Sequence, residues 1–546
     1  MNLARLFKMS PTSLRVSALV VPAILGGVLA GCGGGYNSPM TPPAPSPVSV
    51  QVSGTSPFSA SCGNTAATGE SFTLGSGIQP QIAAMPGGAV GVWQQDRWTG
   101  LGARGILTAH SGDSGATWSA AQALGFSKCA AGTGPGAGYD RASDPWVTFG
   151  GSGVLYASAL AFSATGFLAP GGLSAVLVSR SADGGATWGA PVAVMADTNG
   201  AASPFFFNDR DSVTADPVTG NVYLVWDRIT DAGNLSMPAY LALWTTASGT
   251  WSTRVLYDPG LANGVGNEAF NNEIVILPTG VVLDFFTLLT LSTSTASLQV
   301  IRSTDQGATW STAPVTVASV NSVVTANPIP NGTLIRDSPN MAQVAADPNS
   351  TAVAAVWQQS FGSTTYNGIA LSVSKDGGAT WSAPKQVNGV KTVAAFDPTV
   401  RYLPGGVLAV TYYDFRDYVA GSSVLSTSFW LSESNDGGAT WHELRMQSPF
   451  DLNKAPAAAS GFGTALFLGD NQGLALVGSD ALPLYAATTS AGAHVYATQS
   501  PNPLTSSSAH VYMAAAQRPL PAAAAANAQA SVERMRLRAF SPRGRP

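Results

Sequence analysis

Arginine and aspartate stand next to each other at several places in this chain, where they could recognise an anionic ligand. Examples are Asp96-Arg97, Asp209-Arg210-Asp211 and Arg336-Asp337. Only 10% of the residues are charged, so this grouping is selective. A guanidinium group suits bidentate binding of a carboxylate, which makes a carboxylate-bearing ligand one interpretation. The alternative is that each Arg–Asp pair braces neighbouring parts of the fold.

A strand–turn–strand pattern recurs along the chain and must position these residues. Two clear copies run over 211–226 and 341–357, and both end in tryptophan. Equivalent starts lie near Gln79, Asp144, Asn272, Asp397 and Phe467. The 60 Gly and 36 Pro favour short strands and turns over long helices. Four-stranded antiparallel units repeated radially are typical of a β-propeller.

An octapeptide of the form S-x-D-x-G-A-T-W also occurs five times. The copies span 111–118, 181–188, 303–310, 374–381 and 434–441, and their aspartates are Asp113, Asp183, Asp305, Asp376 and Asp436. The carboxylate can accept backbone N–H bonds in a tight turn, and the glycine permits the backbone angle of that turn. We therefore interpret these aspartates as structural. The wide gap between the second and third copies predicts a decayed copy at 245–251.

The octapeptide resembles the Asp box of the sialidase superfamily, also called the BNR repeat. The resemblance implies an all-β fold, a six- or seven-bladed β-propeller of four-stranded antiparallel blades. In such a propeller the boxes lie on one face, and the enzymes of this superfamily hold their substrate on the other. Sialidases bind the sialate carboxylate with three arginines. Candidates in loops of that second face are Arg97, Arg141, Arg210, Arg336 and Arg416.

The resemblance also implies a catalytic set. Sialidases use a tyrosine nucleophile activated by a glutamate, because a free phenol has a pKa near 10, and an aspartate serves as general acid/base. The order of residues here suggests Glu273 with Tyr412 or Tyr413, which point to opposite faces of a strand. The alternative for both tyrosines is packing between strands. The aspartate is ambiguous among Asp96, Asp144 and Asp211, with Asp144 as our candidate.

One sialidase motif has no counterpart, since Gln79-Pro-Gln-Ile stands where the family has Arg-Ile-Pro or Arg-Leu-Pro. Two functions therefore stay open. The first is a glycoside hydrolase acting on terminal acidic sugars of glycans, and the second is a non-catalytic propeller that binds a glycan or a protein at the cell surface. The four scattered histidines and the lack of nucleotide-binding fingerprints predict no metal or cofactor. The net charge of -4 argues against nucleic acid, and we expect a monomer.

The N-terminus is typical of an export signal. A basic stretch precedes an apolar run over 16–30, which is too short to span a bilayer. The run ends in Leu-Ala-Gly before Cys32. This resembles the bacterial lipobox and implies cleavage before Cys32 and lipidation of its thiol. The resemblance thus predicts an exported protein that is lipid-anchored in the cell envelope, in the outer membrane or facing the periplasm. The alternative is a plain secretory signal with an incidental cysteine.

We therefore expect a signal peptide (1–31), a Gly/Pro/Ser-rich tether (32–70), the propeller (71–500) and a low-complexity Ala/Arg-rich tail (501–546). Cys62 and Cys129 remain after lipidation. Passage through an oxidising compartment allows them to pair, although two separate buried thiols fit almost as well. The last strand unit looks short, and an N-terminal strand at 71–74 is our candidate to complete it.

Overall fold

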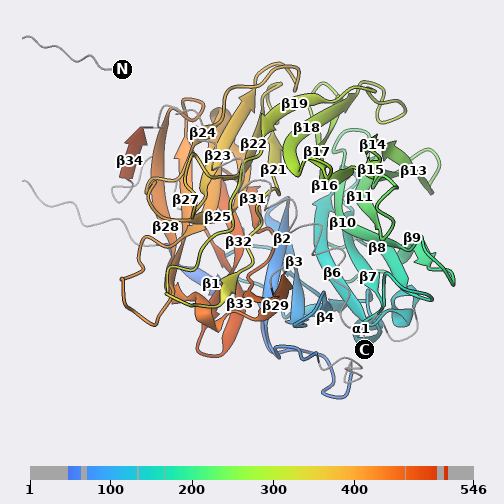
Figure 1. Ribbon diagram of the computed structural model, residues 1–546, viewed down its shortest axis with the longest axis horizontal. Coiled ribbons are helices and arrows are strands. Elements are labelled where there is room, and N and C mark those ends of the chain that lie inside the picture. The colour runs from blue at the N-terminus through green and yellow to red at the C-terminus, as the bar shows by residue number, and fades with distance from the viewer. Residues whose placement is uncertain are drawn as a thin grey trace, which may run out of the picture. The chain divides into compact units, whose positions relative to one another are not determined.

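Short runs of β-branched and aromatic residues, separated by glycine-rich turns, favour strands through most of the part of the chain that the structure describes. The computed structural model describes residues 47–62, 70–131, 134–164, 166–460, 463–500 and 510–513. Among these, most strands form groups of four in which each strand pairs antiparallel with the next. We call these groups units 1 to 7. Figure 1 shows their first strands gathered near the centre of the body formed by 44–546.

Units 1 to 3 occupy the first half of the body. Unit 1 consists of β2 (Gly77–Met85), β3 (Gly88–Arg97), β4 (Ala103–Ser111) and β5 (Gln122–Leu124). Unit 2 consists of β6 (Arg141–Phe149), β7 (Leu155–Phe162), β8 (Leu173–Ser181) and β9 (Val192–Thr198). A single bridge, Ala103 to Ala142, joins units 1 and 2. Unit 3 consists of β10 (Phe206–Ala215), β11 (Val222–Thr230), β12 (Ala239–Trp244) and β13 (Trp251–Tyr257).

Units 4 to 6 repeat the same order. Unit 4 consists of β16 (Glu268–Ile276), β17 (Val282–Thr290), β18 (Thr295–Ser303) and β19 (Val315–Ser319). Unit 5 consists of β21 (Gln343–Ala346), β22 (Val353–Gln359), β23 (Gly368–Ser374) and β24 (Lys385–Gln386). Unit 6 consists of β25 (Ala395–Leu403), β26 (Val407–Asp414), β27 (Ser426–Ser434) and β28 (Thr440–Asp451), to which β34 (His510–Met513) adds a fifth strand.

Unit 7 combines the two ends of the body. Its strands β31 (Gly473–Val477), β32 (Asp480–Thr489) and β33 (Gly492–Thr498) are completed by β1 (Ser49–Gln51), which pairs antiparallel with β33. The completing strand is therefore not at 71–74. That segment leads directly into β2, and Thr73 N–H already donates to the Arg97 carbonyl of unit 1. The segment at 49–51 can reach β33 because twenty-five residues separate it from β2.

Short elements fill the connections. These are α1 (Lys128–Ala131), η1 (Pro135–Gly138), the hairpin β14 (Leu261–Ala262) and β15 (Val265–Gly266), η2 (Pro404–Gly406) and η3 (Leu452–Lys454). A small sheet of β20 (Leu334–Ile335), β30 (Gly463–Leu466) and β29 (Ala457–Ser460) precedes unit 7. None of the helices in the described ranges is long and apolar enough to cross a membrane.

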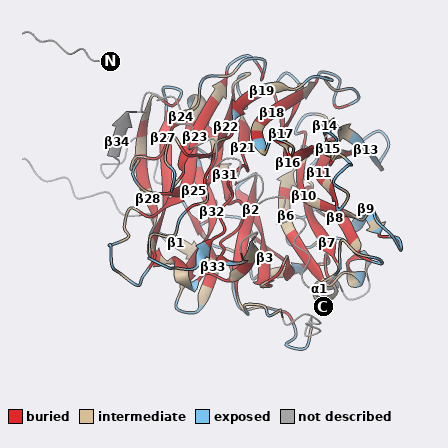
Figure 2. Ribbon diagram, viewed as in Figure 1, coloured by how far each residue is buried: buried red, intermediate tan, exposed pale blue. Residues whose placement is uncertain are grey.

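The second strands carry the largest buried side chains. Trp93, Trp226 and Trp357 lie within these strands, and all three are fully buried. Their indole N–H groups donate to amide oxygens of Gln95, Asn208 and Gln359 at 2.9–3.0 Å. A buried indole needs such a partner. Figure 2 shows burial along most strands, because neighbouring sheets cover both faces of each sheet.

Candidate functional site

The first strands of units 1, 2, 3, 4 and 6 carry a β-bulge close to their start, where the pairing with the second strand shifts register. One residue at each bulge has a positive φ between 49° and 58°: Gln79, Asp144, Arg210, Asn271 and Asp397. A bulge bends its strand and re-aims a side chain, and positive φ is costly for residues other than glycine. This repeated, strained feature brings polar side chains of different units together near one end of the first strands.

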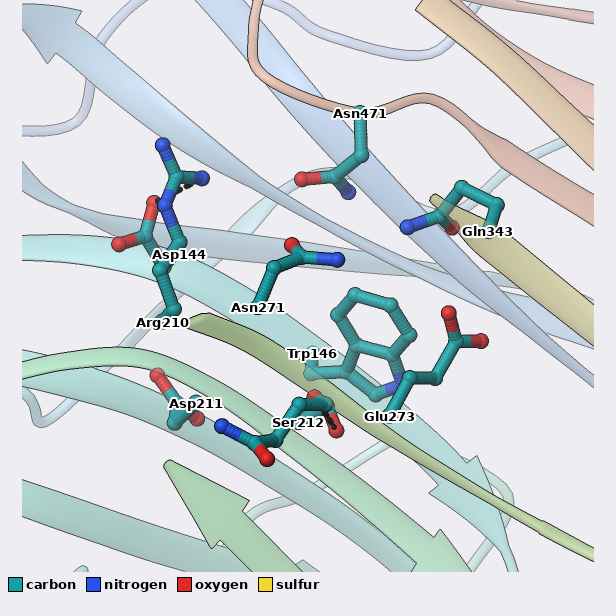
Figure 3. Close-up of a pocket in the computed structure, with 10 residues that line it drawn as sticks. Asp144, Trp146, Arg210, Asp211, Ser212, Asn271, Glu273, Gln343 and Asn471 are labelled. Atoms are coloured by element: carbon teal, nitrogen blue, oxygen red, sulfur yellow. Dashed lines mark hydrogen bonds and ion pairs between the residues drawn. The ribbon is translucent and has the colours of Figure 1, made fainter. Parts of the chain in front are cut away.

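Beside these bulges lies a polar hollow that we call the axial hollow. It is lined by Asp144, Trp146, Arg210, Asp211, Ser212, Asn271, Asn272, Glu273, Gln343 and Asn471. These residues come from the first strands of units 2 to 5 and from the segment entering unit 7 (Figure 3). The cavity volume is about 10 Å³, which is room for one water molecule. The hollow can therefore accept one functional group of a ligand, and a sugar ring would have to lie at its mouth.

Two arginines share one carboxylate next to the hollow. Asp470 Oδ2 lies 2.5 Å from Arg210 Nη2 and 2.6 Å from Arg336 Nη2. The other end of the Arg210 guanidinium lies 3.7 Å from Asp144 Oδ1, which also accepts a hydrogen bond from Gln79 Nε2 at 2.6 Å. These contacts join units 1, 2, 3 and 7 and the segment entering unit 5. Arg–Asp bracing between units is therefore present, as one of the two interpretations expected.

Arg97 brings a further positive charge to this region. Its guanidinium donates to the backbone carbonyls of Gly100 and Gly102. It lies 5.2 Å from the ring centre of Phe467, and Arg336 lies 4.3 Å from the same ring. Burial, and then the nearby charge of Arg336, lower the pKa of Arg97 to about 9. The group still carries its proton at neutral pH, and its hydrogen-bond partners are neutral.

Burial favours the protonated form of two carboxyl groups in the hollow. Burial raises the pKa of Glu273 to about 8, although the charge of Arg401 opposes the shift. One carboxyl oxygen of Glu273 accepts from the Val344 N–H at 3.3 Å. Burial also raises the pKa of Asp211 well above its usual value. Both groups can donate a proton or a hydrogen bond to a ligand.

The five Asp boxes share one geometry at the turns that follow the third strands. Asp376 accepts from the Thr380 hydroxyl at 2.6 Å, from the Thr380 N–H at 2.9 Å and from the Ser374 hydroxyl at 2.8 Å. The bonds from Thr380 lower the pKa of Asp376 to about 2. Equivalent bonds hold Asp113, Asp183, Asp305 and Asp436. Antiparallel pairing places these turns at the opposite end of the sheets from the bulges of the first strands.

One family model matches part of the chain. Residues 220–479 match the model of the BNR repeat-like domain. The matched segment covers just under half of the chain. The resemblance of its Asp boxes to the BNR repeats of the sialidase superfamily is thereby confirmed.

Three solved structures are similar to this chain at low identity. A Hadza microbial sialidase aligns with a TM-score of 0.43 at 15% identity, over 76% of this chain and 74% of its own. A protein of unknown function from Dyadobacter fermentans aligns with a TM-score of 0.41 at 13% identity, over 78% and 94%. Trypanosoma rangeli sialidase with the inhibitor DANA aligns with a TM-score of 0.39 at 13% identity, over 79% and 55%. No curated protein matches the sequence.

The two candidate tyrosines do not meet Glu273. The Tyr412 hydroxyl donates to the Glu443 carboxylate, and the Tyr413 hydroxyl donates to the Ala486 carbonyl at 2.6 Å. Both tyrosines are fully buried. They lie on β26, a second strand that neighbouring sheets cover on both faces, whereas the hollow is lined by first strands. The sialidase arrangement of tyrosine and glutamate expected from the resemblance is therefore wrong for these residues.

Arg416 does not join the other arginines either. Its guanidinium pairs with Asp414 at 2.5 Å and with Glu443, and it lies 3.7 Å from the ring centre of Trp430. All of these partners belong to unit 6, so Arg416 is fixed within its own unit. This corrects the expectation that Arg416 would converge with Arg336.

Arg141 lies near Arg97 but has its own counter-ion. Its Nη2 is 2.5 Å from a carboxylate oxygen of Glu70, and its guanidinium lies 4.6 Å from the ring centre of Trp98. Of the five candidate arginines, Arg210 lines the hollow, Arg336 and Arg97 stand next to it, and Arg141 and Arg416 are held elsewhere.

Sequence reasoning missed several residues of the hollow. Trp146, Asn271, Gln343 and Asn471 are neutral, so a search for charged loops passed over them. A signal was present, because each stands close to the start of a repeated strand–turn–strand unit. Aligning the seven starts residue by residue would have placed their side chains at the same level.

Two of the three cysteines lie in the part of the chain that the structure describes. Cys62 and Cys129 form a disulfide with a Cα–Cα distance of 5.6 Å. It attaches the N-terminal segment that carries β1 to the connection after unit 1. Cys32, the expected lipidation site, and the expected signal peptide lie outside the described residues.

Proposed function

We propose that this protein binds acidic sugar residues of glycans at the axial hollow, as a non-catalytic, seven-bladed β-propeller. The observation that carries this proposal is the composition of the hollow and its surroundings. Arg210, Trp146 and several amide side chains line a concave site, and such mixtures of one aromatic with convergent polar groups are typical of ligand sites.

The acidic character of the ligand follows from the charges. Arg210 and Arg336 share Asp470, and Arg210 also lies 3.7 Å from Asp144. The hydrogen-bond partners of Arg97 are backbone carbonyls, so three guanidinium groups stand near these two carboxylates. Burial raises the pKa of Glu273 and of Asp211, which lessens the repulsion that these groups exert on an anion. A carboxylate that enters the hollow would accept hydrogen bonds from Arg210 and from amide groups, while the sugar ring stays at the mouth.

The blade number rests on the strand groups. Seven groups of four strands occur in the described residues, and the Gln79 N–H of unit 1 donates to the Leu468 carbonyl at the start of unit 7. The hydrogen bond supports a closed ring in which unit 7 lies next to unit 1.

Titration calorimetry with sialyllactose and with lactose tests the function, because the two ligands differ only in the sialic acid residue. We expect sialyllactose to bind and lactose to bind much more weakly or not at all. Arg210→Gln should remove the sialyllactose binding that belongs to the axial hollow, whereas Arg180→Gln, which removes an exposed arginine of β8, should preserve it. Equal affinities for the two sugars, or no binding of sialyllactose and of glucuronate, would overturn the proposal.

A second candidate function, hydrolysis of a terminal acidic sugar, is favoured by one observation. Glu273 has a pKa of about 8 inside the hollow and could act as a general acid. Turnover of fluorogenic sialosides and glucuronides decides between binding and catalysis. Turnover that Glu273→Gln removes would establish the hydrolase, and absent turnover with intact sialyllactose binding would establish the binding protein.

We also propose export and lipid anchoring through Cys32, since Leu-Ala-Gly precedes it. Membrane fractionation of cells that express the full chain checks this. Cys32→Ser should move the protein from the membrane fraction to the soluble fraction. A variant that stays with the membranes would show that the anchor is not at Cys32.

A further inference from the structure

A second hollow lies between the Asp boxes of units 5 and 6, and we call it the inter-box pocket. Its cavity volume is about 380 Å³, which is within the range of small-ligand sites. Lys375, Lys385, Thr380, Trp381, Ser382 and Asp436 supply its polar and aromatic lining. Because the boxes follow the third strands, this pocket is at the other end of the sheets from the axial hollow.

The repeats of this chain show that one lysine of the pocket is specific to unit 5. The residue before the box aspartate is Gly112, Ala182, Thr304, Lys375 and Asn435 in the five boxes. The box geometry is the same in all five, so its turn does not require a cation at this position. Lys375 is exposed at the rim of the pocket.

The second lysine is equally specific. In each unit with a box, the third-strand residue five positions before the box aspartate pairs with a residue of the fourth strand. That partner is Gln122 in unit 1, Val192 in unit 2, Val315 in unit 4, Lys385 in unit 5 and Leu444 in unit 6. Only unit 5 combines a lysine at this position with a lysine inside the box.

Lys385 is held less closely than its counterpart in unit 1. There, Gln122 Nε2 donates to the Ala186 carbonyl in the box of unit 2 at 2.9 Å. Lys385 Nζ reaches the Gly437 carbonyl in the box of unit 6 only at 3.5 Å. Within the described residues, no ion pair involves the ammonium group of Lys375 or Lys385. Both ammonium groups are therefore available to an anion.

Trp381 supplies an aromatic wall. Its indole N–H donates to the Gly378 carbonyl at 3.2 Å, and its ring packs edge-on against Phe285 of unit 4 with centres 5.6 Å apart. These contacts fix the ring, which is half-buried and lines the pocket. At the rim, Asp436 is ionised at neutral pH, because hydrogen bonds within its box hold its pKa at about 2 in spite of partial burial. Its carboxylate can accept a hydrogen bond from a sugar hydroxyl.

We propose that the inter-box pocket binds an acidic sugar residue. The sugar ring lies against Trp381, its carboxylate or sulfate group lies between Lys375 and Lys385, and a hydroxyl donates to Asp436. Ammonium groups form charge-assisted bonds with such anions, and fixed aromatic rings provide apolar area at low entropic cost. This site is independent of the axial hollow, and the two sites together would give the protein two glycan contacts at opposite ends of its sheets.

Calorimetry with three hexasaccharides tests this site in the Arg210→Gln background, where the axial hollow is disabled. The ligands are an oligogalacturonate, a heparin-derived fragment and cellohexaose, which carry carboxylate only, sulfate with carboxylate, and no charge. We expect at least one acidic hexasaccharide to bind with a Kd that rises with salt. Cellohexaose should bind at least tenfold more weakly. Galacturonate binding identifies carboxylate recognition, and binding of the heparin fragment alone identifies sulfate recognition.

The matched variant takes its residues from unit 4 of the same chain. Lys375→Thr with Lys385→Val should weaken binding about tenfold, since each exposed ion pair contributes up to about 1 kcal/mol. Lys454→Thr removes an exposed lysine elsewhere and should leave binding unchanged. Lys375→Glu, which alters no packing, is a second test and should also weaken binding. Absent binding of both acidic hexasaccharides, or unchanged affinity in the double variant and in Lys375→Glu, would overturn the proposal.

Discussion

Arg336 donates two hydrogen bonds to the Asp470 carboxylate, from Nη2 to Oδ2 at 2.6 Å and from Nε to Oδ1 at 3.3 Å. The two residues are 134 positions apart in the chain, and their side chains are buried. Asp470 binds Arg210 with the same Oδ2. One carboxylate thus neutralises part of the charge of two guanidinium groups from different parts of the fold. It links these parts beside the axial hollow.

Replacing Asp470 should destabilise the protein strongly. In Asp470→Ala, Arg210 and Arg336 lose their shared counter-ion, and an uncompensated buried charge costs about 3–5 kcal/mol. Urea denaturation should show a clearly lower midpoint. Asp480→Ala removes an exposed aspartate from the same unit and should leave the midpoint nearly unchanged. Equal midpoints for the two variants would contradict the role of Asp470.

Replacing a box aspartate should destabilise the protein mildly without affecting a ligand site at the other end of the sheets. Asp376→Ala removes the acceptor of three hydrogen bonds. The residue is exposed, so we expect a loss of about 1 kcal/mol. The melting temperature measures the loss, with Lys375→Ala in the same box as control. Loss of sialyllactose binding at an unchanged melting temperature would contradict a structural role.

The buried acids make stability depend on pH. The pKa of Glu273 is about 8 in the folded protein, against 4.5 for the free side chain, so the folded state binds the proton more tightly. Its contribution is complete below about pH 4.5 and is lost as pH rises through 8. Glu268 affects stability in the same direction, because burial and the negative charge of Asp209 raise its pKa to about 8.

The box aspartates have the opposite effect. Asp376 has a lowered pKa of about 2, against 3.8 for the free side chain, so its contribution is present above pH 3.8 and is lost as pH falls through 2. Calorimetric melting should therefore be highest near pH 4–5 and should decline toward pH 8. Glu273→Gln should reduce the decline. A melting temperature that rises steadily from pH 5 to pH 8 would contradict the burial of these acids as neutral groups.

The disulfide should stabilise the attachment of the N-terminal strand. Cys62 and Cys129 are 67 residues apart, and a loop of this size makes a disulfide contribute about 2–4 kcal/mol. Cys129→Ser should lower the denaturation midpoint, and dithiothreitol should lower that of the unmodified protein to the same value. A midpoint that neither change lowers would show that β1 stays paired with β33 without the disulfide.

Much of the fold was predictable from local patterns. Five Asp boxes and seven strand–turn–strand starts predicted four-stranded antiparallel units, because a box is a local turn whose hydrogen bonds all lie within eight residues. Ser374, Asp376 and Thr380 form their bonds within one copy, so the sequence contains the whole interaction.

The contacts around the axial hollow could not be predicted from local patterns. The sequence indicated Arg210 and Glu273, but pairing them with Arg416 and Tyr412 required knowing which strands line the hollow. Tyr412 lies on a second strand and bonds to Glu443 instead. The partner of Arg336 was also hidden, since Asp470 is 134 residues away and no local pattern links the two.

The sequence by itself determined the repeat, the turns and the alternation of buried and exposed positions, because these depend on neighbouring residues and on the backbone angles that glycine and aspartate allow. Only the tertiary structure decided which charges meet. The bulges at Gln79, Asp144 and Arg210 aim side chains from separate units into one space, and β1 comes from the far end of the chain to complete unit 7. Those contacts depend on how whole sheets pack around an axis, and that packing brings together residues hundreds of positions apart.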